Sequence, residues 1–173
     1  PKTAGSSETF TVTGLAQGTT YYFALKAADE VPNWSAISNV PSTTLPTQDT
    51  TAPAAVANLA IGSTTTASVT LNWTATGDDG STGKATTYDL RYSTSPINSS
   101  NFGSATQVTN EPAPKTAGQA ESFTVTGLAA GTTYYFALKV ADEVPNWSAI
   151  SNVPSGATQN PADVTAPATV TNL

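Results

Sequence analysis

The sequence contains no cysteine, no histidine and no methionine in its 173 residues. Without cysteine the chain forms no disulfide and no thiolate metal site, so a hydrophobic core must hold the fold on its own. Without histidine or cysteine, Ser-His and Cys-His nucleophile systems are excluded within these residues. The missing methionine indicates that the natural start is not in view, which leaves an upstream signal peptide open.

Positive charge is also scarce, with 6 Lys and Arg against 12 Asp and Glu and a net charge of −6. The basic side chains are scattered singly along the chain, whereas a phosphate-binding surface needs them clustered. Nucleic acid and anionic membranes are therefore excluded as partners. A membrane helix needs about 18–20 consecutive apolar residues, and no run approaches that length.

What the chain does contain is Thr, Ser, Ala, Gly and Pro in abundance, with only 10% charged residues. Low charge combined with Thr, Val and aromatic residues favours short strands and turns over helices. No stretch shows sustained helical periodicity. This composition is typical of a secreted or surface β-protein, so we expect an extracellular or cell-surface location.

An internal repeat is the main feature of the sequence. Residues Glu8–Ser42 and Glu121–Ser155 differ at three of 35 positions, and "PKTAG" occurs at both Pro1–Gly5 and Pro114–Gly118. The offset is 113 residues throughout this part, while the linkers that follow differ in length and sequence. Units that keep their sequence while their connectors vary are typical of a tandem array.

Between about residues 49 and 159 the sequence predicts one complete unit of short strands. The evidence is alternation of apolar and polar residues, as in "SVTLNWTA" and "TYDLRYS", interrupted by Gly- and Asp-rich turns such as "TGDDGSTG". Strands are expected at 56–62, 68–75, 87–93, 105–109, 121–128, 133–143 and 148–153. Seven short alternating strands in about 100 residues predict a two-sheet antiparallel sandwich.

Three motifs carry a family resemblance: the "TAP" start, "VTLNW", and above all "GLAAGTTYYFAL". Together they resemble bacterial fibronectin type III repeats over the complete unit. The resemblance implies an all-β fold of tandem fibronectin type III-like (immunoglobulin-like) sandwiches, seven-stranded with Greek-key connections. It also implies that Tyr134, and Tyr21 in the first copy, are tyrosine-corner residues. The expected core residues are Trp73, Tyr88, Leu90, Tyr92, Phe123, Val125, Leu128, Tyr134, Phe136, Leu138 and Tyr21.

Three domain segments follow from this register. Residues 1–44 supply the last three strands (E, F and G) of an upstream domain, residues 49–159 are the complete domain, and residues 163–173 supply the first strand of a downstream domain. An isolated half-sandwich would leave large apolar side chains in water, at about 1.5–3 kcal/mol each. We therefore expect the 173 residues to be a window on a longer polymer of repeats, with neighbouring copies as partners in a head-to-tail filament.

Adjacent acidic residues form the candidate metal site. In the family's topology the loops that carry these residues lie at one end of the domain, so their carboxylates would lie close together. The weak candidates for Ca²⁺ ligands are Asp49, Asp78, Asp79, Asp142 and Glu143. A hard cation prefers several such oxygens, but no loop has EF-hand-like spacing. The alternative is a pair of solvated acidic loops. A glycosidase carboxylate pair is not expected either, because it needs a cleft. The chain is predicted to be non-catalytic, without a cofactor.

Trp34 and Trp147 follow the same turn in the two copies, in "PNWSAIS". An exposed Trp can stack on a sugar ring, which would make carbohydrate a partner. The alternative, which we favour from the sequence, is that each Trp caps the open end of the core.

Three functions remain. The repeats favour a structural module of an extracellular fibre, stalk or adhesin shaft, because near-identical units present the same faces at a regular advance. The family resemblance favours spacer domains of a secreted polysaccharide-degrading enzyme. Loop aromatics and acids would suit a carbohydrate-binding module.

Overall fold

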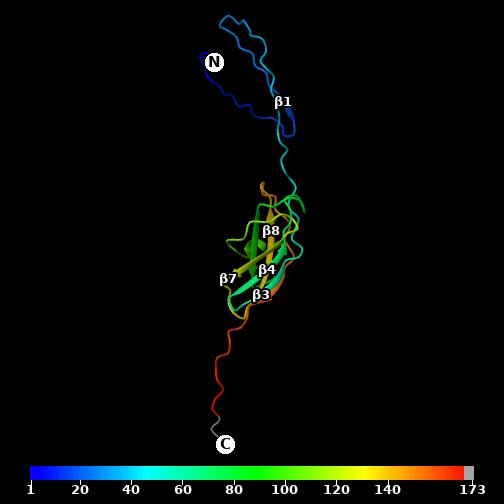
Figure 1. Ribbon diagram of the computed structural model, residues 1–173, viewed down its shortest axis with the longest axis vertical. Coiled ribbons are helices and arrows are strands. Elements are labelled where there is room, and N and C mark those ends of the chain that lie inside the picture. The colour runs from blue at the N-terminus through cyan, green and yellow to red at the C-terminus, as the bar shows by residue number, and fades with distance from the viewer. Residues whose placement is uncertain (170–173) are drawn as a thin grey trace. The chain divides into compact units, whose positions relative to one another are not determined.

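The chain divides into two units, Pro1–Asp49 (unit 1) and Thr50–Leu173 (unit 2). The structure is a computed structural model that describes residues 1–169, and Figure 1 shows the chain coloured from its N-terminus to its C-terminus. Among these residues the helical content is a single 3₁₀ turn, Phe102–Ser104. The same residues contain no helix long and apolar enough to cross a bilayer.

The first sheet of unit 2 has three antiparallel strands in the order β3-β4-β7. They are β3 (Ala60–Thr64), β4 (Ser68–Thr74) and β7 (Ala120–Thr126). Strand β4 is central because it alternates strictly, with apolar residues on the face toward the core and polar residues on the other. Its buried residues are Val69, Leu71 and Trp73. β7 pairs with all seven residues of β4, which places Val125 opposite Val69.

The second sheet has four antiparallel strands in the order β6-β5-β8-β9. They are β5 (Thr87–Ser93), β6 (Thr106–Gln107), β8 (Thr133–Ala141) and β9 (Ser155–Ala157). β5 and β8 are the long central pair and are matched over seven residues. β6 and β9 lie at the edges of the sheet. Because both strands are short, they offer little free backbone for unwanted pairing with other chains.

The two sheets enclose one hydrophobic core. Trp73 of β4 and Tyr88 of β5 meet edge to face with ring centroids 5.4 Å apart, and Tyr92 and Tyr134 do so at 5.7 Å. Of the residues expected in the core, these eight are buried in this cluster: Trp73, Tyr88, Leu90, Val125, Leu128, Tyr134, Phe136 and Leu138. Tyr92 and Phe123 are partly buried and pack against it. This is the seven-stranded all-β sandwich that the alternation predicts.

The chain enters and leaves unit 2 at opposite ends of the sandwich. At the entrance, the Ala54 N–H donates to the Gly80 carbonyl (2.9 Å), which lies in the loop after β4. At the exit, the Gln159 N–H donates to the Thr65 carbonyl (2.8 Å), which lies in the turn before β4. Each copy of such a unit therefore advances the chain by about the length of a strand.

The last strand differs from the sequence prediction. Residues 148–153 form no strand, and β9 begins only at Ser155. The Ser148 and Ser151 hydroxyls accept the N–H groups of Val140 and Leu138, each at 3.0 Å. In a regular sheet, carbonyl oxygens of the neighbouring strand would accept these N–H groups. Because serine hydroxyls accept them here, regular pairing with β8 begins only after these serines.

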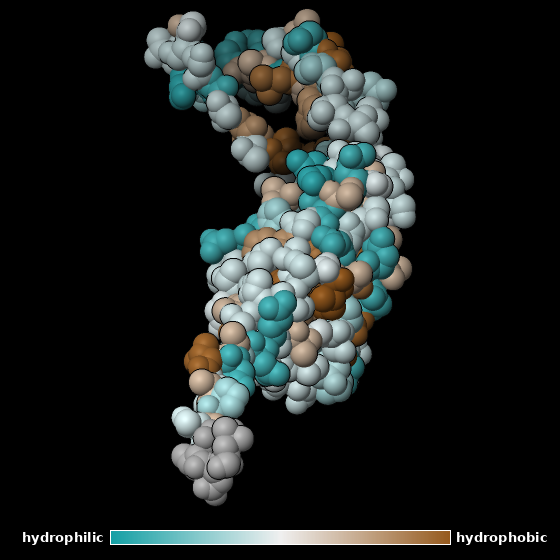
Figure 2. Space-filling model, turned by 60° about the horizontal axis from the view of Figure 1, so that its bottom comes forward, coloured by the Kyte–Doolittle hydropathy of each residue, from teal (hydrophilic) through white to brown (hydrophobic). Residues whose placement is uncertain are grey.

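Unit 1 contains two short strands, β1 (Thr20–Tyr22) and β2 (Ser42–Thr44), paired antiparallel. Tyr21 lies in β1 and is half-buried, outside the core cluster. Its hydroxyl accepts the Ala16 N–H at 2.9 Å, as the Tyr134 hydroxyl accepts the Ala129 N–H at 3.0 Å in unit 2. Hydrophobic side chains lie at the surface of unit 1 (Figure 2).

Candidate functional site

The acidic turn after β8 is closed by Asp142. One carboxylate oxygen accepts the N–H groups of Val144 (3.0 Å) and Asn146 (2.8 Å), and the other accepts the Asn146 side-chain amide (2.8 Å). Burial by itself raises the pKa of Asp142, but these hydrogen bonds outweigh it and leave the pKa below its ordinary value. Both oxygens of the carboxylate thus hold the turn.

Asp29 makes the same turn in unit 1. Its carboxylate accepts the Val31 and Asn33 N–H groups and the Asn33 amide at 2.8–3.0 Å. The Asn33 side chain is the main reason that the pKa of Asp29 lies below its ordinary value. The motif forms from the local sequence in both copies.

The candidate calcium ligands do not form one cluster. Asp142 is buried in the turn, Glu143 beside it is exposed, and Asp78 and Asp79 lie in the loop between β4 and β5. Asp49 belongs to unit 1. Among residues 1–169, no three acidic side chains lie close enough to hold a metal ion. The calcium hypothesis therefore depends on the sequence alone.

The two tryptophans are exposed, so the prediction that they cap the core is wrong. Trp147 has 42% of its surface exposed and Trp34 has 64%. In unit 2 Trp147 pairs with Ala141 through an isolated β-bridge, and it belongs to neither hydrophobic cluster of the described residues. A flat exposed indole suits stacking on a sugar ring, although one ring alone does not make a site.

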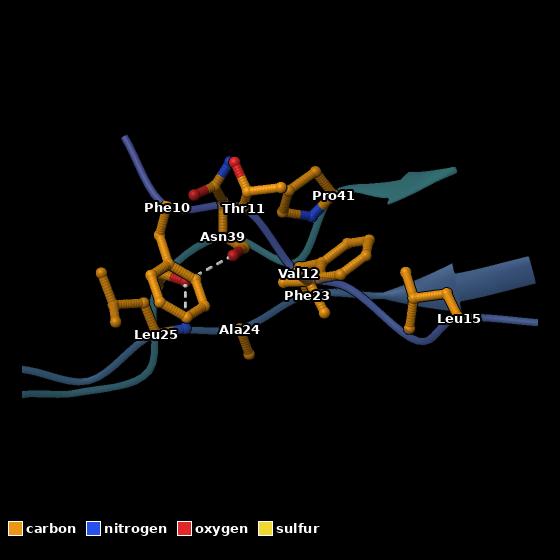
Figure 3. A pocket seen from close by; sticks show the side chains of 10 residues that line it. Phe10, Thr11, Val12, Leu15, Phe23, Ala24, Leu25, Asn39 and Pro41 are labelled. Carbon is orange, nitrogen blue, oxygen red and sulfur yellow. Dashed lines mark hydrogen bonds between the residues drawn. The ribbon is translucent and has the colours of Figure 1, made fainter. Parts of the chain in front are cut away.

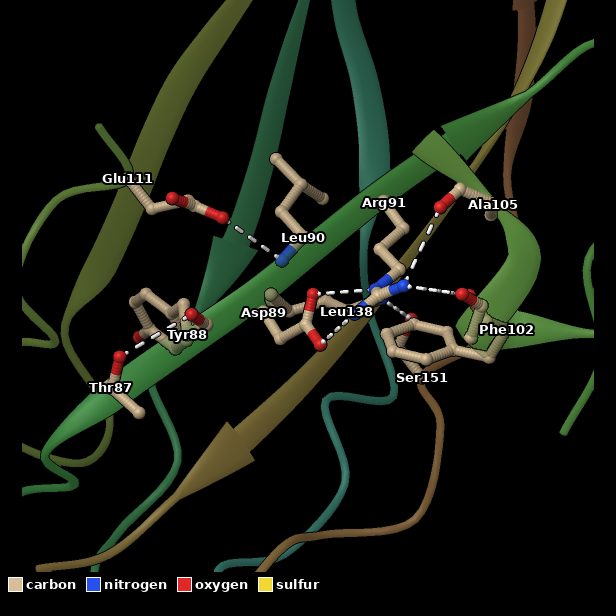
Figure 4. A network of polar contacts seen from close by, with 11 residues as sticks. Thr87, Tyr88, Asp89, Leu90, Arg91, Phe102, Ala105, Glu111, Leu138 and Ser151 are labelled. Carbon is tan, nitrogen blue, oxygen red and sulfur yellow. Dashed lines mark hydrogen bonds and ion pairs between the residues drawn. The ribbon is translucent and has the colours of Figure 1, made fainter. Parts of the chain in front are cut away.

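A polar network on the outer face of the four-stranded sheet centres on Arg91 (Figure 4). The guanidinium donates to both carboxylate oxygens of Asp89, at 2.8 and 3.0 Å, and to the Gly103 carbonyl at 2.9 Å. Its carbon lies 5.0 Å from the Phe102 ring centroid. Hydrogen bonding to Asp89 raises the pKa of Arg91. A guanidinium stays protonated in proteins, so these contacts fix a loop and do not take part in proton transfer.

The fixed loop is the long segment after β5. Phe102 and Ile97 of this segment are buried against Ala137 of β8, which forms a second, smaller hydrophobic cluster. The Lys139 ammonium adds a second cation over the Phe102 ring, at 5.4 Å. The alternation in "TYDLRYS" puts Asp89 and Arg91 on the outer face of the strand but does not predict this cover. The signals available were the apolar Ile97 and Phe102 within an otherwise polar connection.

A buried polar cluster lies under the first sheet. Glu121 is 4% exposed, and its carboxylate accepts the Lys115 N–H at 2.6 Å while the Lys115 ammonium lies 3.4 Å away. Among the described residues, neither the Trp73 indole nitrogen nor the Tyr88 hydroxyl has a hydrogen-bond partner. Burial raises the pKa of Tyr88 to about 12, and the nearby Glu121 charge adds to the rise. These groups are enclosed in the sandwich and offer no cleft for a substrate.

A family model described as the N-terminal domain of purple acid phosphatase matches residues 55–154, which is more than half of the chain. The chain belongs to this family. The match to the purple acid phosphatase N-terminal domain family begins before β3 and ends one residue before β9, so it covers most of the sandwich. The family description concerns a domain and its fold, and it names no residue in this chain.

Curated relatives of this member of the purple acid phosphatase N-terminal domain family are polysaccharide-degrading enzymes by name. Chitinase A1 of Niallia circulans is 41% identical over 157 residues, which are 88% of this chain and 19% of that protein. Exoglucanase B of Cellulomonas fimi is 35% identical over 156 residues, which are 88% of this chain and 13% of that protein. The chain thus spans less than a fifth of the length of these relatives.

Among solved structures, a crystal structure of titin domains is similar, with a TM-score of 0.50 and 18% identity. The similarity covers 72% of this chain and 37% of that one. It shows the fold, a β-sandwich, in agreement with the fold that the resemblance in the sequence implies. The tandem array beyond these residues stays a prediction.

Proposed function

We propose that this chain is a non-catalytic spacer in a secreted polysaccharide-degrading enzyme. The observation that carries the proposal is the match to a chitinase and an exoglucanase over 88% of this chain but only 19% and 13% of those enzymes. A segment that small is suited to separate parts of a protein rather than to cleave a glycosidic bond, which needs two carboxylates on either side of a cleft. Such an enzyme acts on an extracellular polymer, so the proposed location is extracellular.

The geometry of unit 2 supports a spacer. Because the chain enters near Gly80 and leaves near Thr65, at opposite ends of β4, the unit extends the polypeptide instead of returning it. The linker between β2 and unit 2, residues 45–49, is short and contains Pro46, which limits bending between neighbouring units.

The second candidate is a structural repeat of an extracellular fibre. It is favoured by the near-identity of Glu8–Ser42 and Glu121–Ser155, since equal units stack at a regular advance. The comparisons with known proteins favour the spacer more strongly, because the named relatives are enzymes and not fibre subunits.

The full reading frame that encodes these residues provides the test. The spacer proposal expects a glycoside hydrolase domain in the same frame. It also expects that deletion of residues 50–159 leaves the turnover of soluble oligosaccharides unchanged and lowers activity on the insoluble polymer. A frame made only of repeats would overturn the proposal in favour of the fibre.

A matched experiment on residues 1–173 alone tests the carbohydrate-binding alternative. The spacer proposal expects no hydrolysis of chitin or cellulose and no retention on either polymer. Retention that is lost in Trp147→Ala and kept in Lys84→Ala, a change at an exposed loop residue, would assign carbohydrate binding to the exposed indole.

A further inference from the structure

The segment that leaves unit 2 is held by Thr158, directly after the last residue of β9. Thr158 is 3% exposed. Its N–H donates to the Thr132 carbonyl (3.0 Å), and its hydroxyl accepts the Thr132 N–H (3.0 Å) and donates to the Ala129 carbonyl (2.6 Å). A buried threonine whose N–H and hydroxyl are both bonded fixes the backbone at this point to the residues that precede β8, in the four-stranded sheet.

The next residue, Gln159, is bonded on the side of the other sheet. Its N–H donates to the Thr65 carbonyl (2.8 Å), and its side-chain amide donates to the Thr64 carbonyl (2.8 Å). Thr64 is the last residue of β3, and Thr65 lies in the turn that leads into β4. The Gly131 N–H in turn donates to the Gln159 carbonyl (3.1 Å). Two consecutive residues therefore bridge the two sheets of the sandwich.

Asn160 extends the docked segment by one residue. Gly131 has a φ of +63°, and a Cβ at this position would overlap the Asn160 Oδ1, so only glycine leaves room for the amide. Residues 161–169 are all exposed. The docked part of the leaving segment is thus residues 158–160.

The segment that enters unit 2 is also bonded on both sides of the sandwich. In the loop after β4, the Gly80 N–H donates to the Ala52 carbonyl (3.1 Å). Between β8 and β9, the Asn152 side chain accepts the Leu59 N–H (2.8 Å) and donates to the Leu59 carbonyl (2.7 Å), across 93 positions of sequence. Its counterpart in unit 1, Asn39, lines the apolar groove shown in Figure 3.

The contacts of the leaving segment depend on residue types that unit 1 does not share. At the offset of 113 residues, Leu45 stands at the position of Thr158 and Pro46 at that of Gln159. Leucine has no hydroxyl, and proline has neither an N–H nor a side-chain amide. The difference between the two linkers is therefore a chemical difference in how each can be held.

We propose that residues 158–160 form a clamp that fixes the direction in which the chain leaves unit 2, so that this unit is a stiff coupler. The inference rests on the proposed spacer function and adds a mechanical property to it. A flexible linker lets the segment that follows point in many directions. Because Thr158 and Gln159 are bonded to both sheets, the pivot begins only at Pro161, whose ring restricts φ as well.

Two spin labels on the 173-residue chain test the clamp. The chain has no cysteine, so Ser122→Cys and Ala162→Cys create the labelling sites without any background. Ser122 is exposed on β7, and Ala162 is exposed just past the clamp. Double electron–electron resonance measures the distribution of distances between the two labels. The width of this distribution reports how far the leaving segment swings.

Thr158→Val combined with Gln159→Ala removes the side-chain bonds of the clamp. We expect this double variant to widen the distance distribution at least about twofold, because the segment then moves as a flexible linker. Amide hydrogen exchange at Thr132, which loses its acceptor, should become about tenfold faster. Ser155→Ala, a change at an exposed position of β9, is the matched control and should alter neither quantity.

An unchanged width in the double variant, or a wild-type width equal to that of the variant, overturns the clamp. Gln159→Ala alone keeps the test decisive if the double variant does not fold, because Gln159 is exposed and its side chain lies outside the core. This single variant should widen the distribution by less than the double variant, and no widening would again contradict the proposal. Neither result bears on the spacer function, which depends on the domains encoded beside these residues.

Discussion

At the scale of single residues, several local polar contacts of this chain occur in both copies. Asp29 and Asp142 accept the same three hydrogen bonds although the first is exposed and the second is 2% exposed. Tyr21 and Tyr134 accept the same backbone N–H five residues upstream. A contact that spans two to five residues forms wherever the sequence is present, but its effect on stability depends on what surrounds it.

Asp142→Ala is expected to lower the melting temperature, because it leaves the partly buried N–H groups of Val144 and Asn146 without the carboxylate that accepts them. Asp29→Ala, the matched control, removes the same bonds in water and should leave the melting temperature unchanged. The lowered pKa of Asp142 adds stability above the ordinary carboxyl pKa, and this is lost as the pH falls through the pKa in the folded state. Calorimetry of both variants across acidic pH checks this. Equal effects of the two substitutions would contradict it.

Tyr88→Phe is expected to be neutral or slightly stabilising at neutral pH, because the hydroxyl is buried without a partner. Since the pKa of Tyr88 rises from about 10 to about 12 on folding, the folded state holds this proton more tightly. The wild type therefore loses stability between pH 10 and 12, by up to about 3 kcal/mol, and the variant loses less. Urea unfolding measured in this range, with Tyr135→Phe at a half-buried position as control, decides the question.

At the scale of elements, one sequence forms a strand in one place and none in another. Ala120–Thr126 is strand β7 because β4 supplies a backbone partner along all of it, whereas residues 7–13 have no such partner among the described residues. β8 has nine residues because β5 pairs with it over seven of them. Its counterpart β1 has three residues and pairs only with β2 among the described residues. Strand propensity in these segments is expressed only against a partner.

Val125→Ala and Val12→Ala form a matched pair that tests this difference. Val125 is 3% exposed, and its truncation should lower the free energy of unfolding by about 1–3 kcal/mol through lost contacts and a small cavity. Val12 is 45% exposed, and its truncation should change that free energy by less than about 0.5 kcal/mol. Denaturant unfolding of the two variants gives both values, and similar losses would show that unit 1 is packed as well as unit 2.

The loop after β5 depends on Arg91. Arg91→Ala removes the hydrogen bonds to Asp89 and Gly103 and the cation over Phe102, so we expect a loss of about 1–3 kcal/mol. Faster amide hydrogen exchange should be confined to residues 95–105. Lys84→Ala, at an exposed position, is the control. An Arg91→Ala protein with unchanged exchange in this loop would show that Ile97 and Phe102 hold it alone.

At the scale of the whole molecule, the two units differ in how much core they enclose. Unit 2 has two sheets around one core, and unit 1 has one short strand pair beside exposed apolar side chains. The spacer proposal concerns the complete sandwich of unit 2.

Limited digestion with chymotrypsin is expected to cut unit 1 first. Its exposed targets include Phe10, Tyr22 and Leu25, and local unfolding there costs little because few apolar contacts must break. Mass spectrometry should find a resistant fragment that contains residues 50–159. Early cuts within β4 or β8, with unit 1 intact, would contradict this order.

The sequence by itself determined the sandwich, the positions of β4, β5, β7 and β8, and the tyrosine corner. Alternation and turn residues act over short distances, so they can be read without coordinates. The late start of β9 was not predicted, because the hydroxyls of Ser148 and Ser151 take up strand N–H groups only once the chain is folded back.

Tertiary structure alone decided the rest. It placed Phe102 under Arg91, left Trp147 exposed and kept the acidic residues from forming one cluster. It also made a strand of residues 120–126 but not of residues 7–13, which match them at five of seven positions. The physical reason is shared: a ladder needs a partner backbone and burial needs an opposing sheet, and both come from residues far away in the sequence.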